Sequence, residues 1–293
     1  MSVRATGAFE RQDAKFRGWA ELPAPPGRYH LYVALACPWS QRAVIARRLK
    51  GLEDMVGISY LHPYRDDRGW AFTGDGYTDG INGFEYLAEA YEQTEPGYDG
   101  RVSVPVLWDG ETRLIVSNES HDIMRMFNAA SPEPDLYPAP LRDEIDRLNE
   151  RVYATVNNGV YRAGFARTQE AYDEAFDQLF GTLGELEALL ATRRYLAGEQ
   201  ITEADWRLFP TLVRFDPVYY VHFRCNGRRL VDHPNLWAYA RELYQQPGIA
   251  ETVAMDEIKT HYYTTHDSLN PKRIVPRGPL DLDWTALHGR DQR

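Results

Sequence analysis

The sequence predicts two domains, an α/β domain followed by an all-helical one. In the first part, short apolar runs that fit β-strands alternate with segments of helical periodicity. A proline-rich stretch at 128–140 interrupts this alternation, and the apolar residues beyond it recur at helical spacing. A chain of 293 residues, 43% of them hydrophobic, is long enough for two domains that share an interface. We therefore predict one domain at 1–131 and a second at 132–293.

The first domain is expected to hold a small mixed sheet covered by helices. The run RYHLYVALA at 28–36 predicts a buried strand, and 38–49 predicts a helix with an apolar face. A second strand is predicted for MVGISYL at 55–61. The stretch at 104–118 predicts a hairpin that turns at its Asp-Gly pair, and 120–128 returns to helical spacing.

The second domain is predicted to be helical throughout. Apolar residues that line one face predict a long helix: Tyr172, Phe176, Leu179, Leu183, Leu186 and Leu190. Thr202 and Asp205 have the spacing of a capping box, with Asp where Glu is usual, and they open a helix across 201–215. Two further helices are predicted at 235–245 and 249–258.

Composition excludes several classes of function. A net charge of −10 argues against nucleic-acid binding, which needs a basic surface. Two cysteines cannot form a disulfide framework, so a reducing cytoplasm is expected. No stretch approaches the roughly 18 apolar residues of a membrane span, and the N-terminus lacks the apolar core of a signal peptide. The histidines have no metal-site spacing, and the glycine-rich stretch at 74–83 fits no nucleotide-binding motif, so neither a metal nor a nucleotide is expected.

One cysteine stands at a position that favours reactivity. Cys37 follows the first predicted strand, and Pro38 comes next, at the first position of a helix, where its missing N–H costs nothing. The free amides and the positive end of that helix favour a thiolate. The alternative is a buried structural cysteine, the usual place for a free thiol. The strand before Cys37 and the proline after it favour the reactive thiol.

The residue three positions further on limits the chemistry of this thiol. Redox sites of this form usually carry a second cysteine there, and this chain has Ser40. An adduct on Cys37 therefore cannot collapse into an internal disulfide, and an external thiol must release it. Glutathione is the obvious cytosolic thiol. The other cysteine, Cys225, stands in the helical half and is interpreted as a bystander.

Six stretches that span nearly the whole chain form a recognisable set: CPWSQRA (37–43), RVSVPVLWD (101–109), SNESHDIMRMFN (117–128), NNGVYRAGFA (157–166), FDPVYYVHFRCN (215–226) and HYYTTHDSLNPKRIVPRGP (261–279). With the features above, this set resembles the glutathione transferase superfamily, and most closely its glutathionyl-hydroquinone reductases, the xi class. The resemblance implies a thioredoxin-like N-terminal domain and an all-α glutathione-transferase-like C-terminal domain. In one departure, Ser40 stands where the family motif usually has Ala.

The resemblance implies a glutathione site in the first domain. Cys37 matches the family's nucleophile. Val104 and Pro105 match a cis peptide bond whose Val104 backbone pairs with the cysteinyl part of glutathione, and X-Pro is the bond for which cis is cheap. Glu119 and Ser120 match the pair that holds the γ-glutamyl group, where a helix N-terminus suits a carboxylate. Simple capping of that helix is the alternative role.

The remaining implied contacts are aromatic or basic. Trp70 matches a tryptophan that contacts glutathione, and Arg101 could pair with a carboxylate of the tripeptide. Tyr161, Tyr219 and Tyr262 match the aromatic pocket for the hydroquinone, where rings stack on the substrate and hydroxyls bind its oxygens or move protons. Buried core tyrosines are the alternative. Three neighbours in the sequence could take these places instead: Tyr220, Tyr263 and His261.

The function implied by the resemblance is glutathione-dependent reduction of S-glutathionyl-hydroquinones. Cys37 forms a mixed disulfide with glutathione, and oxidised glutathione is released. The implied enzyme needs no metal or nucleotide and forms a homodimer. Two alternatives stay open: a thiol transferase or dehydroascorbate reductase of omega type, and a noncatalytic scaffold that kept the fold. The sequence does not name the quinone.

Overall fold

The computed structural model describes residues 2–3 and 7–291, and its first half contains the predicted mixed sheet. Four strands, β3 (Tyr29–Val33), β4 (Val56–Tyr60), β5 (Val106–Asp109) and β6 (Leu114–Ser117), lie in the order β4-β3-β5-β6. The β3–β4 pair is parallel, and the other two pairs are antiparallel. The thioredoxin-like architecture predicted for this half is therefore confirmed.

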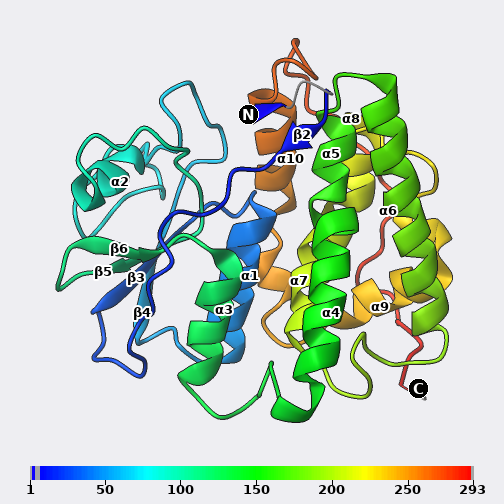
Figure 1. The fold of residues 1–293 in the computed structure, drawn as a ribbon, viewed down its shortest axis with the longest axis horizontal. Coiled ribbons are helices and arrows are strands. Elements are labelled where there is room, and N and C mark those ends of the chain that lie inside the picture. Colours follow the sequence, from blue (N-terminus) through cyan, green and yellow to red (C-terminus); the bar gives the residue numbers. More distant parts are fainter. Residues whose placement is uncertain (1, 4–6, 292–293) are drawn as a thin grey trace.

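The two faces of the sheet are covered by different elements (Figure 1). Helices α1 (Pro38–Leu49) and α3 (Ser120–Ala129) pack side by side between the sheet and the helical half of the molecule. The small helix α2 (Ala88–Thr94) lies at the far end of the sheet, against β6. Successive side chains of a strand point to opposite faces, so Leu31 belongs to the apolar cluster under α1 and Tyr32 to the cluster on the other face.

The second half is helical, as predicted (Figure 1). Thr202 N–H donates to Asp205 at 2.7 Å at the start of α7, so the predicted capping box forms. This half contains α4 (Arg142–Val152), a π-turn at Tyr153–Asn157, α5 (Gly159–Gly164), α6 (Gln169–Leu190), α7 (Glu203–Arg214), a second π-turn at Phe215–Tyr219, α8 (Tyr220–His222), α9 (Pro234–Tyr244) and α10 (Met255–Thr265); short 3₁₀ turns lie at Ala139–Leu141, Leu230–Asp232 and Ala250–Thr252.

The hairpin loop and the last helix differ from the sequence prediction. The hairpin loop spans 110–113, so it is wider than a turn at the Asp-Gly pair. The last helix begins at Met255 rather than at 249, because Ala250–Thr252 forms a separate 3₁₀ turn. That helix also runs on to Thr265, because Ile258 and Tyr262, one helical turn apart, both pack into the core. The predicted domain boundary at residue 131 falls in the connection between α3 and α4, and it stays a prediction.

The N-terminal arm, residues 7–18, runs across the junction of the two halves (Figure 1). Strand β2 (Phe9–Glu10) pairs with β1 (Ser2–Val3). At the other end of the arm, Gly18 N–H donates to Val116 O at 2.8 Å. The arm is therefore tied to the sheet at Gly18 and passes over the region between the halves.

Buried polar contacts join the two halves beneath the arm. Arg214 of α7 is fully buried and donates to the carbonyls of Leu35 at 3.0 Å and Ala36 at 3.1 Å. Arg42 of α1 is buried as well and donates to Asn157 Oδ1 at 2.8 Å. Both guanidinium groups satisfy acceptors in the opposite half, so the halves are held in a definite relation. No helix within residues 2–3 and 7–291 has the length and apolar character of a membrane span.

Candidate active site

Cys37 lies at the N-terminus of α1, as the sequence predicts. It is the N-cap residue, with extended backbone, and Pro38 follows at the start of the helix. Its N–H donates to Ala34 O at 2.9 Å and its carbonyl accepts from Gln41 N–H at 3.0 Å, so the turn before the helix is well defined. The Sγ atom lies 3.7 Å from Val104 O, and 9% of the residue is exposed.

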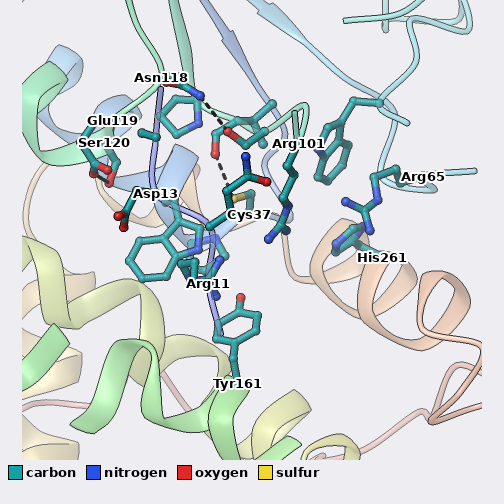
Figure 2. A pocket seen from close by; sticks show the side chains of 18 of the residues that line it. Arg11, Asp13, Cys37, Arg65, Arg101, Asn118, Glu119, Ser120, Tyr161 and His261 are labelled. Carbon is teal, nitrogen blue, oxygen red and sulfur yellow. Dashed lines mark hydrogen bonds between the residues drawn. The ribbon is translucent and has the colours of Figure 1, made fainter. Parts of the chain in front are cut away.

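The thiol faces a cleft between the two halves (Figure 2). The space in the cleft, including the part open to solvent, is about 1030 Å³. All of the site residues named from the sequence line it, except Tyr219: Cys37, Trp70, Arg101, Val104, Pro105, Glu119, Ser120, Tyr161 and Tyr262. The structure thus brings together residues up to 225 positions apart in the sequence.

One wall of the cleft is the segment that enters β5. The peptide bond between Val104 and Pro105 is cis, as predicted. Val104 is buried against Cys37 in the second apolar cluster. The backbone of Val104 therefore lies beside the thiol, in position to pair with an extended ligand.

Glu119 and Ser120 lie at the N-terminus of α3, across the cleft from Arg65 in Figure 2. Glu119 is the N-cap, and its Oε1 accepts from His121 N–H at 3.3 Å and lies 2.9 Å from His121 Nδ1. Burial alone would raise the pKa of Glu119, but the hydrogen bonds and charge of His121 bring it below its ordinary value. Glu119 is therefore ionised near neutral pH. Glu119 caps the helix and also lines the cleft, so its role as a helix cap does not exclude contact with a ligand.

Three arginines line the cleft: Arg11, Arg65 and Arg101. In the part of the chain that the structure describes, none of them forms an ion pair with a carboxylate. Burial, and then the charges of Arg11 and Arg65, lower the pKa of Arg101 to about 10. Arg65 also lies over the ring of Trp70, 5.7 Å from its centre. This grouping of mutually repelling cations is suited to a ligand with carboxylates.

The tyrosine hydroxyls form a chain. Tyr161 on α5 and Tyr262 on α10 have their oxygens 2.5 Å apart, and Tyr219 lies 3.0 Å from Tyr262 on the other side. Tyr219 is fully buried, so it lies behind the two that line the cleft. Burial raises the pKa of all three phenols. They are therefore protonated near neutral pH and can donate hydrogen bonds.

His261, a sequence neighbour of Tyr262, also lines the cleft, whereas Tyr220 and Tyr263 do not. Its ring stacks on Trp70 with ring centres 4.9 Å apart. His261 Nδ1 lies 2.7 Å from Pro63 O. A carbonyl only accepts, so Nδ1 carries the proton and Nε2 is left as an acceptor. Burial lowers the pKa of His261 to about 3, which keeps the ring neutral.

Several further residues line the cleft that sequence reasoning did not find. The N-terminal arm has no regular periodicity, and no sequence signal shows that it crosses the site. Trp39 follows the Cys-Pro pair and was visible only as part of the motif. These additional lining residues include Phe9, Arg11, Asp13, Trp39, Arg65, Tyr153, Phe165 and His266.

The two residues that bear on the thiol chemistry have clear places. Ser40 is fully buried on α1, and its Oγ accepts from Ala34 N–H at 3.4 Å. Its hydroxyl therefore supports the turn before Cys37. Cys225 is also fully buried, and burial raises its pKa far above the ordinary value. Both cysteines are free thiols, and no cluster of three potential metal ligands occurs within the described residues.

Comparisons with known proteins agree with this architecture. Residues 36–130 match the family model "Glutathione S-transferase, N-terminal domain", and 169–242 match "Glutathione S-transferase, C-terminal domain". The chain is 48% identical to the glutathionyl-hydroquinone reductase YqjG of Escherichia coli, over 98% of this chain and 93% of the relative. It is 49% identical to the glutathionyl-hydroquinone reductase PcpF of Sphingobium chlorophenolicum, over 93% of this chain and 90% of the relative.

Solved structures agree as well. A glutathione-bound structure of YqjG superposes with a TM-score of 0.91 at 47% identity, covering 94% of this chain and 96% of that one. The xi-class glutathione transferase of Natrialba magadii gives a TM-score of 0.92 at 51% identity, covering 97% of this chain and 93% of that one. Near-full-length identity at this level and the match of both domain models leave one assignment. The chain belongs to the glutathione S-transferase family, and within it to the glutathionyl-hydroquinone reductases of the xi class.

Proposed function

We propose that the protein reduces S-glutathionyl-hydroquinones to hydroquinones with glutathione as co-substrate. One observation carries this proposal: the Cys37 thiol, without a second cysteine in its turn, opens on the same cleft as a pair of hydrogen-bonded tyrosine hydroxyls. The thiol is suited to mixed-disulfide chemistry with an external thiol. The hydroxyls are suited to the oxygens of a hydroquinone.

Glutathione is placed by groups along the cleft. Ser120 at the α3 N-terminus receives the α-carboxylate of the γ-glutamyl group, and ionised Glu119 receives its ammonium. The Val104 backbone pairs with the cysteinyl residue beside Cys37, in the manner of an added strand. Arg101 pairs with the glycine carboxylate. These four contacts bring the glutathionyl sulfur to the nucleophile.

In the first half-reaction, the Cys37 thiolate attacks the sulfur of the glutathionyl group. A sulfur–sulfur bond forms, and the bond between sulfur and the ring carbon breaks. The electron pair of that bond stays on the ring carbon, which takes up a proton and leaves as the hydroquinone. The enzyme is left with glutathione in a mixed disulfide on Cys37.

Tyr161 and Tyr262 assist the departing ring. Because burial keeps both phenols protonated, they donate hydrogen bonds to the hydroquinone oxygens and supply the proton for the ring carbon. Tyr219 is a positioning residue that acts through its hydrogen bond to Tyr262. His261 Nε2 offers an acceptor for a hydroquinone hydroxyl on the Trp70 side of the cleft.

In the second half-reaction, the thiolate of a second glutathione attacks the glutathione sulfur of the mixed disulfide. Oxidised glutathione leaves, and the Cys37 thiolate is restored. The sum converts one S-glutathionyl-hydroquinone and one glutathione into hydroquinone and oxidised glutathione. We also propose that the protein works as a homodimer in the reducing cytoplasm, where its two cysteines stay free.

Mass spectrometry of the intact protein tests the proposal directly. After brief exposure to a glutathionyl-hydroquinone without free glutathione, we expect one added glutathione on Cys37 and one equivalent of released hydroquinone. Cys225→Ser should behave like the wild type, whereas Cys37→Ser should neither gain mass nor turn over. An adduct on Cys225 would overturn the assignment.

The rival functions give different results in the same assay. A thiol transferase of omega type would form the adduct from small glutathionyl disulfides but release no hydroquinone from the aromatic substrate. A scaffold would form no adduct with either. Rates on both substrates therefore separate the three functions.

A further inference from the structure

A second hollow, which we call the side pocket, opens next to the active cleft. Its walls come from distant segments of the chain and include Arg65, Phe165, Arg167, Arg224, Thr265 and His266. Arg65, Phe165 and His266 line the active cleft as well. The two hollows therefore adjoin, and Arg65 lies on their shared wall.

The side pocket carries an excess of positive charge. Arg65 is half-buried, and Arg167 and Arg224 are exposed at the rim. Within residues 2–3 and 7–291, Arg65 and Arg224 form no ion pair. The carboxylate of the side pocket, Asp267, already accepts hydrogen bonds from Nε and Nη2 of Arg273 at 2.8 and 2.7 Å. The three arginines are thus not neutralised by the described carboxylates of their own pocket.

Positive charges also repel each other where the side pocket meets the cleft. Burial lowers the pKa of Arg65, and the charge of Arg65 helps to lower that of Arg101. Burial also lowers the pKa of His266 well below its ordinary value, so this ring adds no charge of its own. An anion at the junction would relieve the repulsion between the arginines.

The glutathione bound at Cys37 does not use all of these cations. Its γ-glutamyl carboxylate is assigned to Ser120 and its glycine carboxylate to Arg101. Arg65, Arg167 and Arg224 remain for another negatively charged group.

We propose that the side pocket binds a carboxylate of the molecule that shares the cleft with the glutathione on Cys37. This inference rests on the proposed function, which requires such a molecule in each half-reaction. Two sources bring the same chemistry: an aromatic substrate with a carboxyl substituent, or the second glutathione. Each would extend from the tyrosine pair past Phe165 toward Arg65.

The aromatic source is tested by equilibrium binding, which needs no turnover. Gentisate, a hydroquinone with one carboxylate, and unsubstituted hydroquinone are titrated into the Cys37→Ser protein, with quenching of tryptophan fluorescence as the signal. Charge-assisted hydrogen bonds predict that gentisate binds at least about tenfold more tightly. Arg65→Gln should abolish this preference, and the double variant Arg167→Gln/Arg224→Gln should reduce it. Arg113→Gln, at an exposed arginine on the hairpin loop, is the matched control and should preserve it.

The second source is tested on the isolated second half-reaction. The wild-type mixed disulfide is mixed rapidly with glutathione or with its glycine ethyl ester, whose carboxylate is masked. If the second glutathione uses the side pocket, the ester should react at least about tenfold more slowly, and Arg65→Gln should remove that difference.

If Arg65→Gln removes the carboxylate preference in one experiment, the proposal is supported and the molecule used in that experiment is the source of the carboxylate. If Arg65→Gln removes the preference in both experiments, the side pocket binds both molecules. The proposal is overturned if neither experiment shows a carboxylate preference, or if the preference survives both Arg65→Gln and the double variant. Failure of the proposed function looks different: the wild type would then release no hydroquinone from a glutathionyl-hydroquinone, whatever the binding results.

Discussion

Two hydrogen bonds link the hydroxyls of Tyr161, Tyr262 and Tyr219. Tyr161 and Tyr262 line the cleft, whereas Tyr219 does not. A core role and a catalytic role predict different consequences when one hydroxyl is removed. The buried third member offers a control within the same chain of hydroxyls, because its loss alters packing and hydrogen bonding without removing a group from the cleft.

Tyr161→Phe should lower the rate on a glutathionyl-hydroquinone by about tenfold or more, the range of a proton-transferring group. Reduction of hydroxyethyl disulfide, which needs no carbon protonation, should persist. Stability should fall by no more than about 1 kcal/mol for the lost hydrogen bond. Stopped-flow rates on both substrates are the measurement. Tyr219→Phe is the matched control and should lose less of the hydroquinone rate; equal losses on both substrates in Tyr161→Phe would identify a core tyrosine.

Ser40 decides whether the adduct on Cys37 needs an external thiol. Ser40→Cys places a second thiol in the same helical turn, so an internal disulfide should compete with glutathione and slow turnover. Alkylation followed by mass spectrometry should find the bond between residues 37 and 40 after oxidation. The double variant Cys37→Ser/Ser40→Cys should not form it. A Ser40→Cys protein that never forms the bond would contradict the geometry described for this turn.

At the scale of single elements, the N-terminus of α3 combines a helix cap with a charge cluster. His121 Nδ1 lies 2.9 Å from Glu119, and its Nε2 lies 3.0 Å from Asp122. Asp122 also accepts hydrogen bonds from Nε and Nη2 of Arg17 at 2.7 and 2.8 Å. Burial would lower the pKa of His121, but these hydrogen bonds raise it above its ordinary value. The same contacts outweigh burial and lower the pKa values of Glu119 and Asp122.

This cluster predicts a pH-dependent contribution to stability. The part due to His121 is fully present below its unfolded pKa and is lost as pH rises through its higher folded pKa. The part due to Glu119 and Asp122 is present above their unfolded pKa values and is lost as pH falls through their lower folded values. The stability gap between the wild type and His121→Gln should therefore be widest between about pH 4.5 and 6.5 and narrow at higher pH. Urea unfolding across pH measures the gap; a constant gap would show that the histidine acts only by packing.

Over the whole molecule, buried cations help to hold together the two halves that form the cleft. Arg214 of the helical half donates to the carbonyls of Leu35 and Ala36, in the turn that leads into Cys37. It also donates to Gln41 on α1. A fully buried guanidinium with these partners orients the nucleophile from the opposite half.

Arg214→Met should destabilise the protein by at least about 2 kcal/mol, because it leaves buried acceptors unsatisfied. It should also slow adduct formation on Cys37, because the turn loses its anchor. Arg151→Met, which breaks an exposed pair with Glu185, should cost no more than about 1 kcal/mol. Urea unfolding and the mass-spectrometric rate give the two readouts. If the Arg214→Met variant is destabilised but forms the adduct at the wild-type rate, Arg214 contributes to stability alone.

The sequence by itself determined the local structure. A strand followed by Cys-Pro places a thiol at a helix N-terminus, and the Thr202–Asp205 spacing starts α7, because both signals depend on neighbours within a few residues. The match of many short motifs also identified the family and hence the expected partners of Cys37. Helix ends were less certain, as α10 shows, because packing of Ile258 and Tyr262 decides how far that helix runs.

Only the tertiary structure decided which residues share the cleft. Arg65 and Arg11 come from irregular segments, and no periodicity places them beside Arg101. The tertiary structure also distinguishes two tyrosines with the same side chain, because Tyr219 is fully buried and Tyr161 lines the cleft. The physical reason is that burial, repulsion between arginines and the hydrogen bonds of a phenol depend on which distant segments pack together. A chain's local pattern leaves that packing open until both halves have folded against each other.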